Sequence, residues 1–126
     1  MKTSSAKAKG RVLQQFCAKL IAEKFGLKED DVVSRPMGSG GADLMMSSSA
    51  QKEFPVTLEC KNWKTKPGPE AVEQAKHNAY KGTVGAVAWK PPRKGFDKTL
   101  IMMELTDFLQ LILVVEETAK EGPEKK

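Results

Sequence analysis

Histidine and cysteine are scarce in this chain of 126 residues, which has one histidine and two cysteines. A single histidine gives little support to a Ser/His/Asp triad or to a histidine-rich zinc site. Cys17 and Cys60 are too few and too scattered for the disulfide framework of an exported protein. We therefore expect reduced, buried thiols and a cytoplasmic location.

Long apolar runs and a nucleotide-binding loop are also missing. The largest apolar run, Leu109 to Val115, is far too short to cross a bilayer. Residues 1–10 carry lysines and small residues without a following apolar segment, so we expect no secretory signal and no membrane partner. The glycine-rich segment 38–41 is not followed by Gly-Lys-Ser/Thr, which argues against a P-loop.

Basic residues outnumber acidic ones, 21 against 16, and give a formal net charge of +5. Such a charge attracts polyanions but does not by itself identify a nucleic-acid-binding protein. The basic residues gather in segments 2–11, 61–66 and 90–98. These segments are either three solvated loops or a discontinuous basic rim around one site, of the kind that follows a phosphate backbone.

The hydrophobic pattern predicts one α/β domain over residues 1–126, with 1–8 and 119–126 as flexible tails. A helix between two strands implies a crossover connection, so we expect a central mixed β-sheet flanked by helices. The expected elements are a helix from Ser4 or Ser5 to about Phe25, strands over 31–37 and 42–46, a polar turn over 47–52, a strand over 54–62, a helix over 70–81 with Pro69 in its first turn, strands over 84–90 and 99–105, and a last helix of ten to fourteen residues capped by Thr106 or Asp107.

The tripeptide Glu59-Cys60-Lys61 is the most informative segment of the chain. Side chains alternate along a strand, so Glu59 and Lys61 share one face while Cys60 points to the other, where we expect it in the core. Taken alone, this pattern favours a weak ion pair on an exposed edge.

Asp43 changes this interpretation because it begins the strand before the 47–52 turn. If the strands on either side of that turn form a hairpin, Asp43 and Glu59 meet across the ladder. Two carboxylates and the backbone carbonyl of Cys60 are hard oxygen ligands that suit Mg²⁺ or Mn²⁺. Lys61 could then contact the attacking water or the scissile phosphate. A chance carboxylate pair in an ordinary hairpin is the alternative.

The pattern Gly38-Ser39-Gly40-Gly41-Ala42-Asp43, followed by Glu59-Cys60-Lys61, resembles the PD-(D/E)XK nuclease superfamily. The nearest branch is the small Holliday-junction-resolvase-like one, which includes phage endonucleases; a phage protein would act in the host cytoplasm. The likeness covers about Lys9 to Tyr80, somewhat more than half of the chain. It implies a restriction-endonuclease-like αβββαβ core, a metal bound by Asp43 and Glu59, catalytic help from Lys61, and a supporting role for Ser39.

The first helix departs from this resemblance. Resolvase-like nucleases often carry a metal-binding glutamate there, after a Lys-Gly pair. Lys9-Gly10-Arg11 is present, but the matching position is Gln14, with Gln15 beside it. A neutral amide can bind a metal or its water but adds no charge, which weakens a two-metal mechanism and leaves Gln14 a supporting residue. Gln74, on the helix after the Glu59 strand, is similar to a glutamine of related nucleases and joins the catalytic set.

Several other residues are candidates for DNA contact because of their charge or because a glycine lets a DNA backbone approach. They are Lys9, Arg11, Arg35, Gly40, Lys64 and Lys81. On the helix over 70–81, Lys81 shares one face with Gln74 and with His77 or Asn78, although a solvated polar stripe explains that face equally well. Trp63 either stacks on a base or shields the sheet edge.

These observations predict a Mg²⁺- or Mn²⁺-dependent endonuclease that hydrolyses phosphodiester bonds in branched or structured DNA. The resemblance adds the expectation of a homodimer, since cutting a junction needs two symmetric nicks. Two alternatives stay open. One is a nicking or flap nuclease of phage DNA processing, and the other is a non-catalytic, basic DNA-binding module with a degenerate site, which the neutral Gln14 favours.

Overall fold

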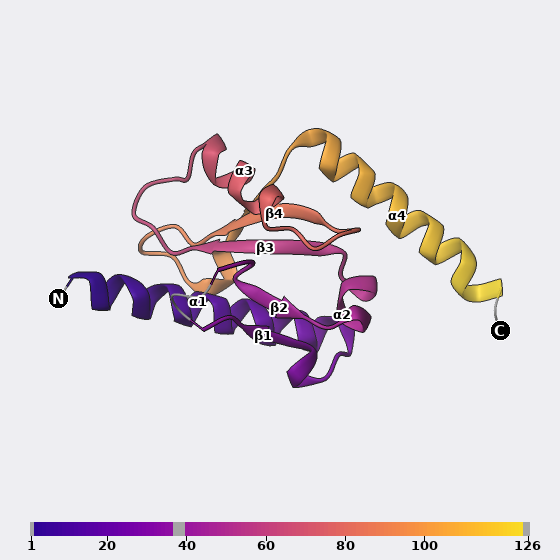
Figure 1. Cartoon of the computed structure of the whole chain (residues 1–126), viewed down its shortest axis with the longest axis horizontal. Helices are drawn as coiled ribbons and strands as arrows, with labels where there is room; N and C mark the ends of the chain where they lie inside the picture. The colour runs from indigo at the N-terminus through magenta and orange to yellow at the C-terminus, as the bar shows by residue number, and fades with distance from the viewer. Residues whose placement is uncertain (1, 37–39, 125–126) are drawn as a thin grey trace.

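A computed structural model of the chain describes residues 2–36 and 40–124, with side chains described over 8–36 and 40–117. Helices and strands are interspersed along the chain (Figure 1). The elements in order are α1 (Lys2–Phe25), η1 (Glu29–Asp31), β1 (Val32–Ser34), β2 (Leu44–Met46), α2 (Ser48–Glu53), β3 (Val56–Lys61), α3 (Pro69–His77), β4 (Val84–Trp89), η2 (Phe96–Lys98), β5 (Leu100–Met102) and α4 (Leu105–Glu124).

The strands form a mixed three-stranded sheet and a separate antiparallel pair. In the sheet, β4 lies between β3 and β5, parallel to the first and antiparallel to the second. α3 makes the crossover from β3 to β4, as parallel neighbours require. β1 and β2 pair antiparallel, with Val32 opposite Met46. The predicted α/β class, with a mixed sheet flanked by helices, is confirmed.

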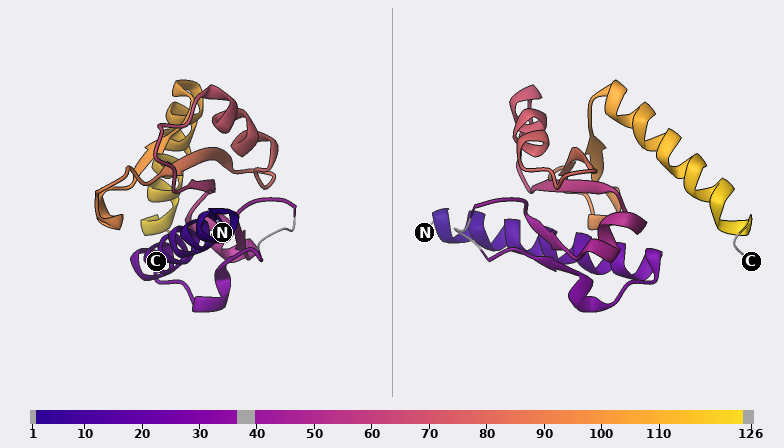
Figure 2. Two further views of the ribbon diagram at one scale, coloured as in Figure 1. Left: turned by 90° about the vertical axis from the view of Figure 1, so that its left-hand side faces the viewer. Right: turned by 45° about the vertical axis from the view of Figure 1, so that its right-hand side comes forward.

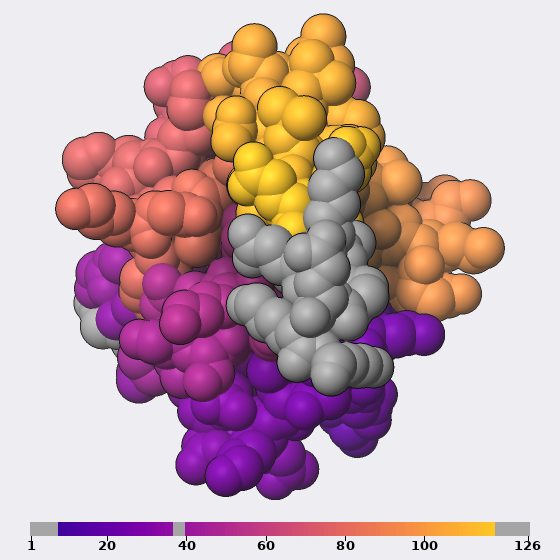
Figure 3. Space-filling view, turned by 90° about the vertical axis from the view of Figure 1, so that its right-hand side faces the viewer, coloured from indigo at the N-terminus to yellow at the C-terminus, as the bar shows by residue number. Residues whose placement is uncertain are grey.

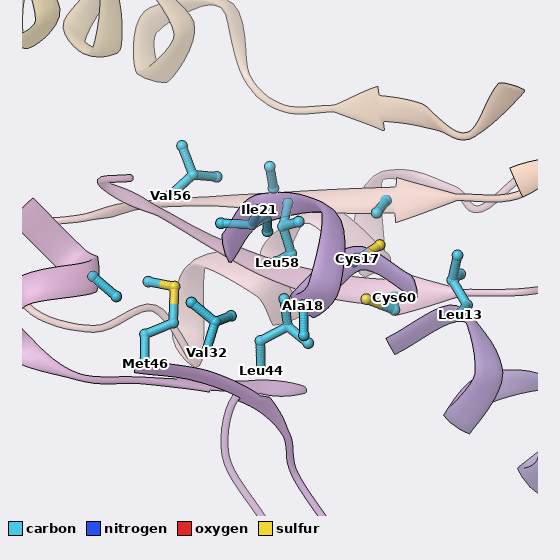
Figure 4. Packing of buried hydrophobic residues seen from close by; sticks show 13 residues of the cluster. Leu13, Cys17, Ala18, Ile21, Val32, Leu44, Met46, Val56, Leu58 and Cys60 are labelled. Atoms are coloured by element: carbon cyan, nitrogen blue, oxygen red, sulfur yellow. The ribbon is translucent and has the colours of Figure 1, made fainter. Parts of the chain in front are cut away.

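The sheet separates two hydrophobic layers because alternate side chains of β3 and β4 point to opposite faces. One layer joins Leu58 and Cys60 of β3 to α1 (Figure 4). The other joins Val87 of β4 to Val72 and Ala75 of α3. α1 therefore covers one face of the sheet and α3 the other, as Figures 1 and 2 show. Cys60 is buried in the core as expected.

α1 forms because apolar residues recur at one-turn spacing and its C-terminal end is well capped. Leu13, Cys17 and Ile21 lie four residues apart and are all buried. Gly26 takes a positive φ of 64°, and the Leu27 amide donates to the Ala22 carbonyl at 2.9 Å. This is the capping geometry that ends helices at glycine, and the predicted end of the helix at Phe25 is confirmed.

The segment predicted as a polar turn is a short helix instead. The Ser47 side chain caps α2 by accepting a hydrogen bond from the Ala50 amide at 3.1 Å. Ala50 is buried in the core cluster, and Gln51 donates to the Met46 carbonyl at 2.9 Å. Serine favours both turns and helix N-caps, and here the burial of Ala50 supports the helix.

The bounds of several other elements differ from the prediction. α3 ends at His77, with Asn78 as its C-cap, so Lys81 lies outside the helix. α4 begins at Leu105, before the expected caps, and continues to Glu124. Residues 2–8 and 119–124, expected as tails, belong to α1 and α4. No helix in the described part of the chain is both long and apolar enough to cross a membrane.

Candidate metal centre

The candidate centre lies at the edge of β3 that faces away from β4. The carbonyls of Pro55 and Lys61 accept hydrogen bonds from the amides of Val84 and Lys90. The odd-numbered residues of this segment therefore direct their backbone polar groups toward β4. In a strand the next residue bonds to the opposite side. Cys60 therefore presents its amide and its carbonyl to the other edge, where its N–H donates to Asp43 Oδ2 at 2.7 Å.

The predicted hairpin between the Asp43 and Glu59 strands is wrong. β2 pairs with β1, and α2 separates β2 from β3 in the chain. Asp43 lies just before β2 and reaches the edge of β3 through its side chain, without a ladder. The two carboxylates still come together, because Glu59 accepts a backbone hydrogen bond from Asp43 and feels its charge.

Both carboxylates occupy surroundings that disfavour their ionised forms. Burial raises the pKa of Asp43. The hydrogen bond from the Cys60 N–H and the positive charges of Lys61 and Arg35 lower this pKa, but their effect is smaller. Burial also raises the pKa of Glu59, and the neighbouring charge of Asp43 raises it further. Glu59 is only 2% exposed. Among the described side chains neither carboxylate forms an ion pair within 4.0 Å; the one such pair joins Lys76 to Glu104.

Lys61 lies beside this carboxylate pair, at the end of β3. Its Nζ donates to Gln74 Oε1 at 3.3 Å and lies 4.9 Å from the centre of the Trp63 ring. The structure thus places Lys61 and Gln74, two members of the expected catalytic set, in contact with each other. The Trp63 carbonyl accepts a hydrogen bond from Trp89 Nε1 at 3.0 Å, which ties the segment after β3 to the end of β4.

Asn78 is a site residue that the sequence analysis did not select. Its Nδ2 donates to Glu59 Oε2 at 3.3 Å. α3 runs antiparallel to β3, so later positions along α3 and the residues after it contact earlier positions of the strand. The contacts in order are Gln74 with Lys61, Asn78 with Glu59, and the Tyr80 amide with Thr57 Oγ1 at 3.1 Å. Asn78 had been grouped with a polar stripe that solvation could explain.

Lys81 does not join the other basic candidates. It follows α3 and precedes β4, whose first residue, Val84, lies opposite Val56 at the start of β3. Lys61 lies opposite Trp89 at the other end of the paired strands. The prediction that Lys81 shares a helix face with Gln74 is therefore wrong, because the helix ends at His77.

Gln14 lies on the part of α1 that faces the end of β3. Before Gln14 in the sequence, the Lys9 carbonyl accepts a hydrogen bond from Asn62 Nδ2 at 3.1 Å. After it, the sulfur of Cys17 contacts that of Cys60 (Figure 4). Gln14 precedes Cys17 by one turn and is only 5% exposed. Its Oε1 is buried and has no hydrogen-bond partner in the described part of the chain.

The glycine-rich segment before Asp43 is described from Gly40 onward, and Ser39 lies outside the described residues. Gly41 has a φ of 102°, and a Cβ there would lie 3.1 Å from the Arg35 guanidinium. Arg35 Nε donates to the Ala42 carbonyl, and the Arg35 amide donates to the Asp43 carbonyl at 2.7 Å. Arg35 is thus fixed beside Asp43, whereas Lys9, Arg11 and Lys64 are exposed.

The residues at this edge fit a hard divalent cation better than zinc. Asp43, Glu59 and the carbonyl of Cys60 offer oxygen ligands, and the buried amide oxygen of Gln14 lies on the stretch of α1 that faces the end of β3. No group of three or more histidine, cysteine and acidic residues suitable for a metal occurs among the described residues. The Cys60 thiol points into the core toward Cys17. The contact with Cys17 and the burial of the thiol both raise its pKa, which lies well above the ordinary value, as expected for a structural thiol.

Comparisons with protein-family models, with curated proteins and with solved structures found no match for this chain. Its function is therefore inferred from the chemistry of the Asp43, Glu59 and Lys61 cluster.

Proposed function

We propose that this protein is a metal-dependent DNA endonuclease of the PD-(D/E)XK kind, in which Asp43 and Glu59 bind a Mg²⁺ or Mn²⁺ ion. One observation carries the proposal. Two carboxylates lie together at a strand edge, largely buried and with raised pKa values, and no cation pairs with either of them within the described structure. Perturbed acidic pairs of this kind gather at functional sites.

A divalent cation explains why such a pair is tolerated. Burying one carboxylate beside another costs free energy unless a positive charge compensates them. The buried Gln14 Oε1 and the Cys60 carbonyl supply neutral oxygen donors on elements that meet at this edge. A bound ion would act there as a Lewis acid on the phosphoryl oxygen and would lower the pKa of a coordinated water.

The chain's own residues have separate roles in this proposal. Asn78 fixes the Glu59 carboxylate, and the Cys60 amide fixes that of Asp43. Lys61 has three N–H donors and shares one with Gln74, so the others can contact a phosphate oxygen. Its ammonium group would stabilise the negative charge that develops as the phosphodiester is attacked.

DNA is the proposed substrate because the protein is basic and the exposed Lys9, Arg11 and Lys64 lie on elements that meet near the end of β3. These residues would contact phosphates, which position a duplex without reading its sequence. Branched or structured DNA and a cytoplasmic location belong to the same proposal. Both cysteines are free thiols, which suits a reducing compartment.

A cleavage assay tests this function on supercoiled plasmid, single-stranded, flap and four-way-junction DNA. The wild-type protein should cut at least one of them with Mg²⁺ or Mn²⁺ and none with EDTA. Asp43→Asn and Lys61→Ala should each lower the cleavage rate by about 100-fold or more, because each removes a charge that the transition state requires. Lys52→Ala and Glu53→Gln, at exposed positions of α2, are the matched controls and should cut like the wild type.

The same assay separates the nuclease from a DNA-binding module with a degenerate site. Binding of labelled junction DNA is measured in parallel with EDTA and with Mg²⁺. A module of that kind would bind equally under both conditions and cut nothing. Cutting by Asp43→Asn at the wild-type rate would show that the catalytic residues lie elsewhere.

A further inference from the structure

Trp63 is exposed, although tryptophan side chains are on average highly buried in proteins. It lies two residues after the end of β3 and is 47% exposed. It belongs to neither hydrophobic core cluster, whereas Trp89, the second tryptophan of the chain, packs against one of them. Both ring–ring contacts in the described part of the chain join phenylalanines, so no aromatic side chain there stacks on Trp63.

The backbone of Trp63 is fixed on the β4 side of the sheet. Its carbonyl accepts a hydrogen bond from Trp89 Nε1 at 3.0 Å, and the Lys61 carbonyl accepts one from the Lys90 amide at 3.0 Å. The free edge of β3 is the opposite one, where Asp43 bonds to the backbone of the strand. Trp63 therefore does not shield that edge, which was the alternative to base stacking.

Lys61 connects the Trp63 ring to the candidate metal centre. Its Nζ lies over the ring at 4.9 Å from the ring centre, within the range of a cation–π contact, and its charge also acts on Asp43 and Glu59. Successive nucleotides of a DNA strand are about 3.4 Å apart along the helix axis. A phosphate that Lys61 binds and a base that stacks on Trp63 can therefore belong to the same nucleotide or to adjacent ones.

The surroundings of Trp63 match a nucleotide, which joins an aromatic base to an anionic phosphate. The segment 61–66 carries three lysines and no acidic residue, and its Lys64 and Lys66 are exposed. Proteins that bind single-stranded nucleic acid combine positive charge along the backbone with aromatic side chains on which the bases stack. Segment 61–66 has both features.

A lipid surface fits this segment less well than a nucleotide does. Tryptophan is also enriched at membrane interfaces. However, even a myristoyl chain gives only marginal membrane binding, and one tryptophan side chain inserts less apolar surface than such a chain. The exposed residues that follow Trp63 are Lys64, Thr65 and Lys66, all polar, so the ring has no apolar neighbour there with which to enter a bilayer.

We propose that Trp63 is a stacking platform for one unpaired nucleobase, next to a phosphate that Lys61 binds beside the candidate metal centre. Because the Lys61 ammonium lies over one face of the ring, the base stacks on the other face. A base inside a duplex is paired and already stacked, so only an unpaired or flipped nucleotide offers a free face. The proposal rests on DNA as the substrate and narrows it to DNA with an unpaired nucleotide at the site, such as a single strand or a flap.

Fluorescence anisotropy of labelled oligothymidylate and of a blunt duplex of the same length, both in EDTA, tests the proposal. Trp63→Ala should weaken single-strand binding by about 5- to 100-fold, the usual effect of losing one stacked base. It should leave duplex binding within about twofold of the wild type, because it removes no charge. Trp63→Phe keeps an aromatic ring and should retain most of the single-strand affinity.

Two further variants separate stacking from charge and from a general loss of aromatic surface. Lys64→Ala should lower the slope of log affinity against log salt by roughly 1, whereas Trp63→Ala should leave this slope unchanged. The matched control, Phe25→Ala, removes a ring that is 43% exposed at the C-terminal end of α1 and should bind like the wild type. α1 ends on the side of the protein shown in Figure 3, away from the end of β3 at the left of Figure 1.

Tryptophan emission gives a second measurement, which carries the test if circular dichroism shows that Trp63→Ala is not folded. Oligothymidylate should quench the emission of the wild type but not that of Trp63→Phe, whose only tryptophan is Trp89. Equal single-strand affinity in the wild type and a folded Trp63→Ala overturns the proposal, as does quenching that persists in Trp63→Phe. Vesicles of anionic lipid that alter the emission where oligothymidylate does not would overturn it in favour of a lipid surface.

These measurements are independent of cleavage, so the two proposals can fail separately. A protein that cuts none of the DNA substrates but binds single strands through Trp63 would refute the nuclease and support the stacking site. A protein that cuts DNA with Mg²⁺, and whose Trp63→Ala variant binds single strands like the wild type, would support the nuclease and refute the stacking site.

Discussion

Glu59 is unusual for a residue of a β-sheet because it is a buried carboxylate with a second carboxylate beside it. It lies on a buried strand, is almost completely shielded from water, and has the Asp43 carboxylate beside it. Its hydrogen bonds come from Asn78 and from a backbone amide, and neither carries a charge. Buried carboxylates in proteins are compensated by a cation or remain protonated. The cation-free protein is therefore expected to be strained at this position.

That strain predicts how stability depends on pH without a metal. The folded-state pKa values of Asp43 and Glu59 are raised above their ordinary values, so the folded state binds protons more readily than the unfolded chain. The free energy of unfolding should thus fall as pH rises from below the ordinary carboxyl pKa through the raised values. In EDTA, Glu59→Gln should melt at a higher temperature than the wild type at pH 7 and should lose this advantage near pH 4.

Adding Mg²⁺ should reverse this order at pH 7. An ion present at about one hundred times its dissociation constant stabilises the state that binds it by roughly 2.7 kcal/mol. The wild type should gain this stability and Glu59→Gln should not, as measured by thermal melts with EDTA and with Mg²⁺. A wild-type melting temperature that Mg²⁺ leaves unchanged, together with a Glu59→Gln variant no more stable in EDTA, would refute this description of the site.

The residues of the pair could be selected from the sequence, but the way they meet could not. Strand alternation places Glu59 and Lys61 on one face, and Asp43 was selected from its position at the start of an expected strand, with the resemblance as further support. The side chain of Asp43 reaches a free backbone amide of β3, a contact that no local pattern encodes. Asn78 was missed for the same reason, because its partner depends on where α3 ends relative to β3.

The close contact between α3 and β4 is the element-scale feature that positions the site. α3 carries Gln74 and Asn78 over β3, and it approaches β4 at Gly85. A Cβ at Gly85 would lie 2.5 Å from the Ala75 carbonyl oxygen, which is backbone and cannot rotate away. Glycine is thus required at this position by the helix that crosses it.

Gly85→Ala should lower the free energy of unfolding by about 1–3 kcal/mol, the usual cost of overpacking. Urea denaturation measures the change. Gly40→Ala is the matched control, since a Cβ at Gly40 meets nothing within 4 Å, and it should be close to neutral. If Gly85→Ala were as stable as the wild type, the packing of α3 on β4 would be looser than described.

The succession of elements could be predicted better than their partners and their ends. Period-two and helical patterns placed α1, β3, α3 and β4 close to their observed positions. The predicted hairpin between β2 and β3 was wrong because the helix α2 takes the place of the turn that would have joined them. A serine-rich segment reads equally as a turn or as a capped helix, and only the burial of Ala50, a tertiary effect, decides between them.

The whole molecule combines a basic domain, an acidic pair at one strand edge and an apolar helix on its periphery. The hydrophobic pattern predicted the class of the fold, and the net charge indicated an attraction to polyanions. Neither could show that α4 leaves one apolar stripe uncovered, because helices with such sequences normally pack all round.

Titration with Mn²⁺, followed by electron paramagnetic resonance of the free ion, tests the central claim most directly. The wild-type protein should bind one Mn²⁺ per chain. Glu59→Gln should weaken this binding at least tenfold, because it removes one of two charged ligands. Glu53→Gln, an exposed carboxylate on α2, should bind like the wild type. Equal Mn²⁺ affinity in Glu59→Gln and the wild type, or no binding by the wild type at millimolar Mn²⁺, would contradict the account.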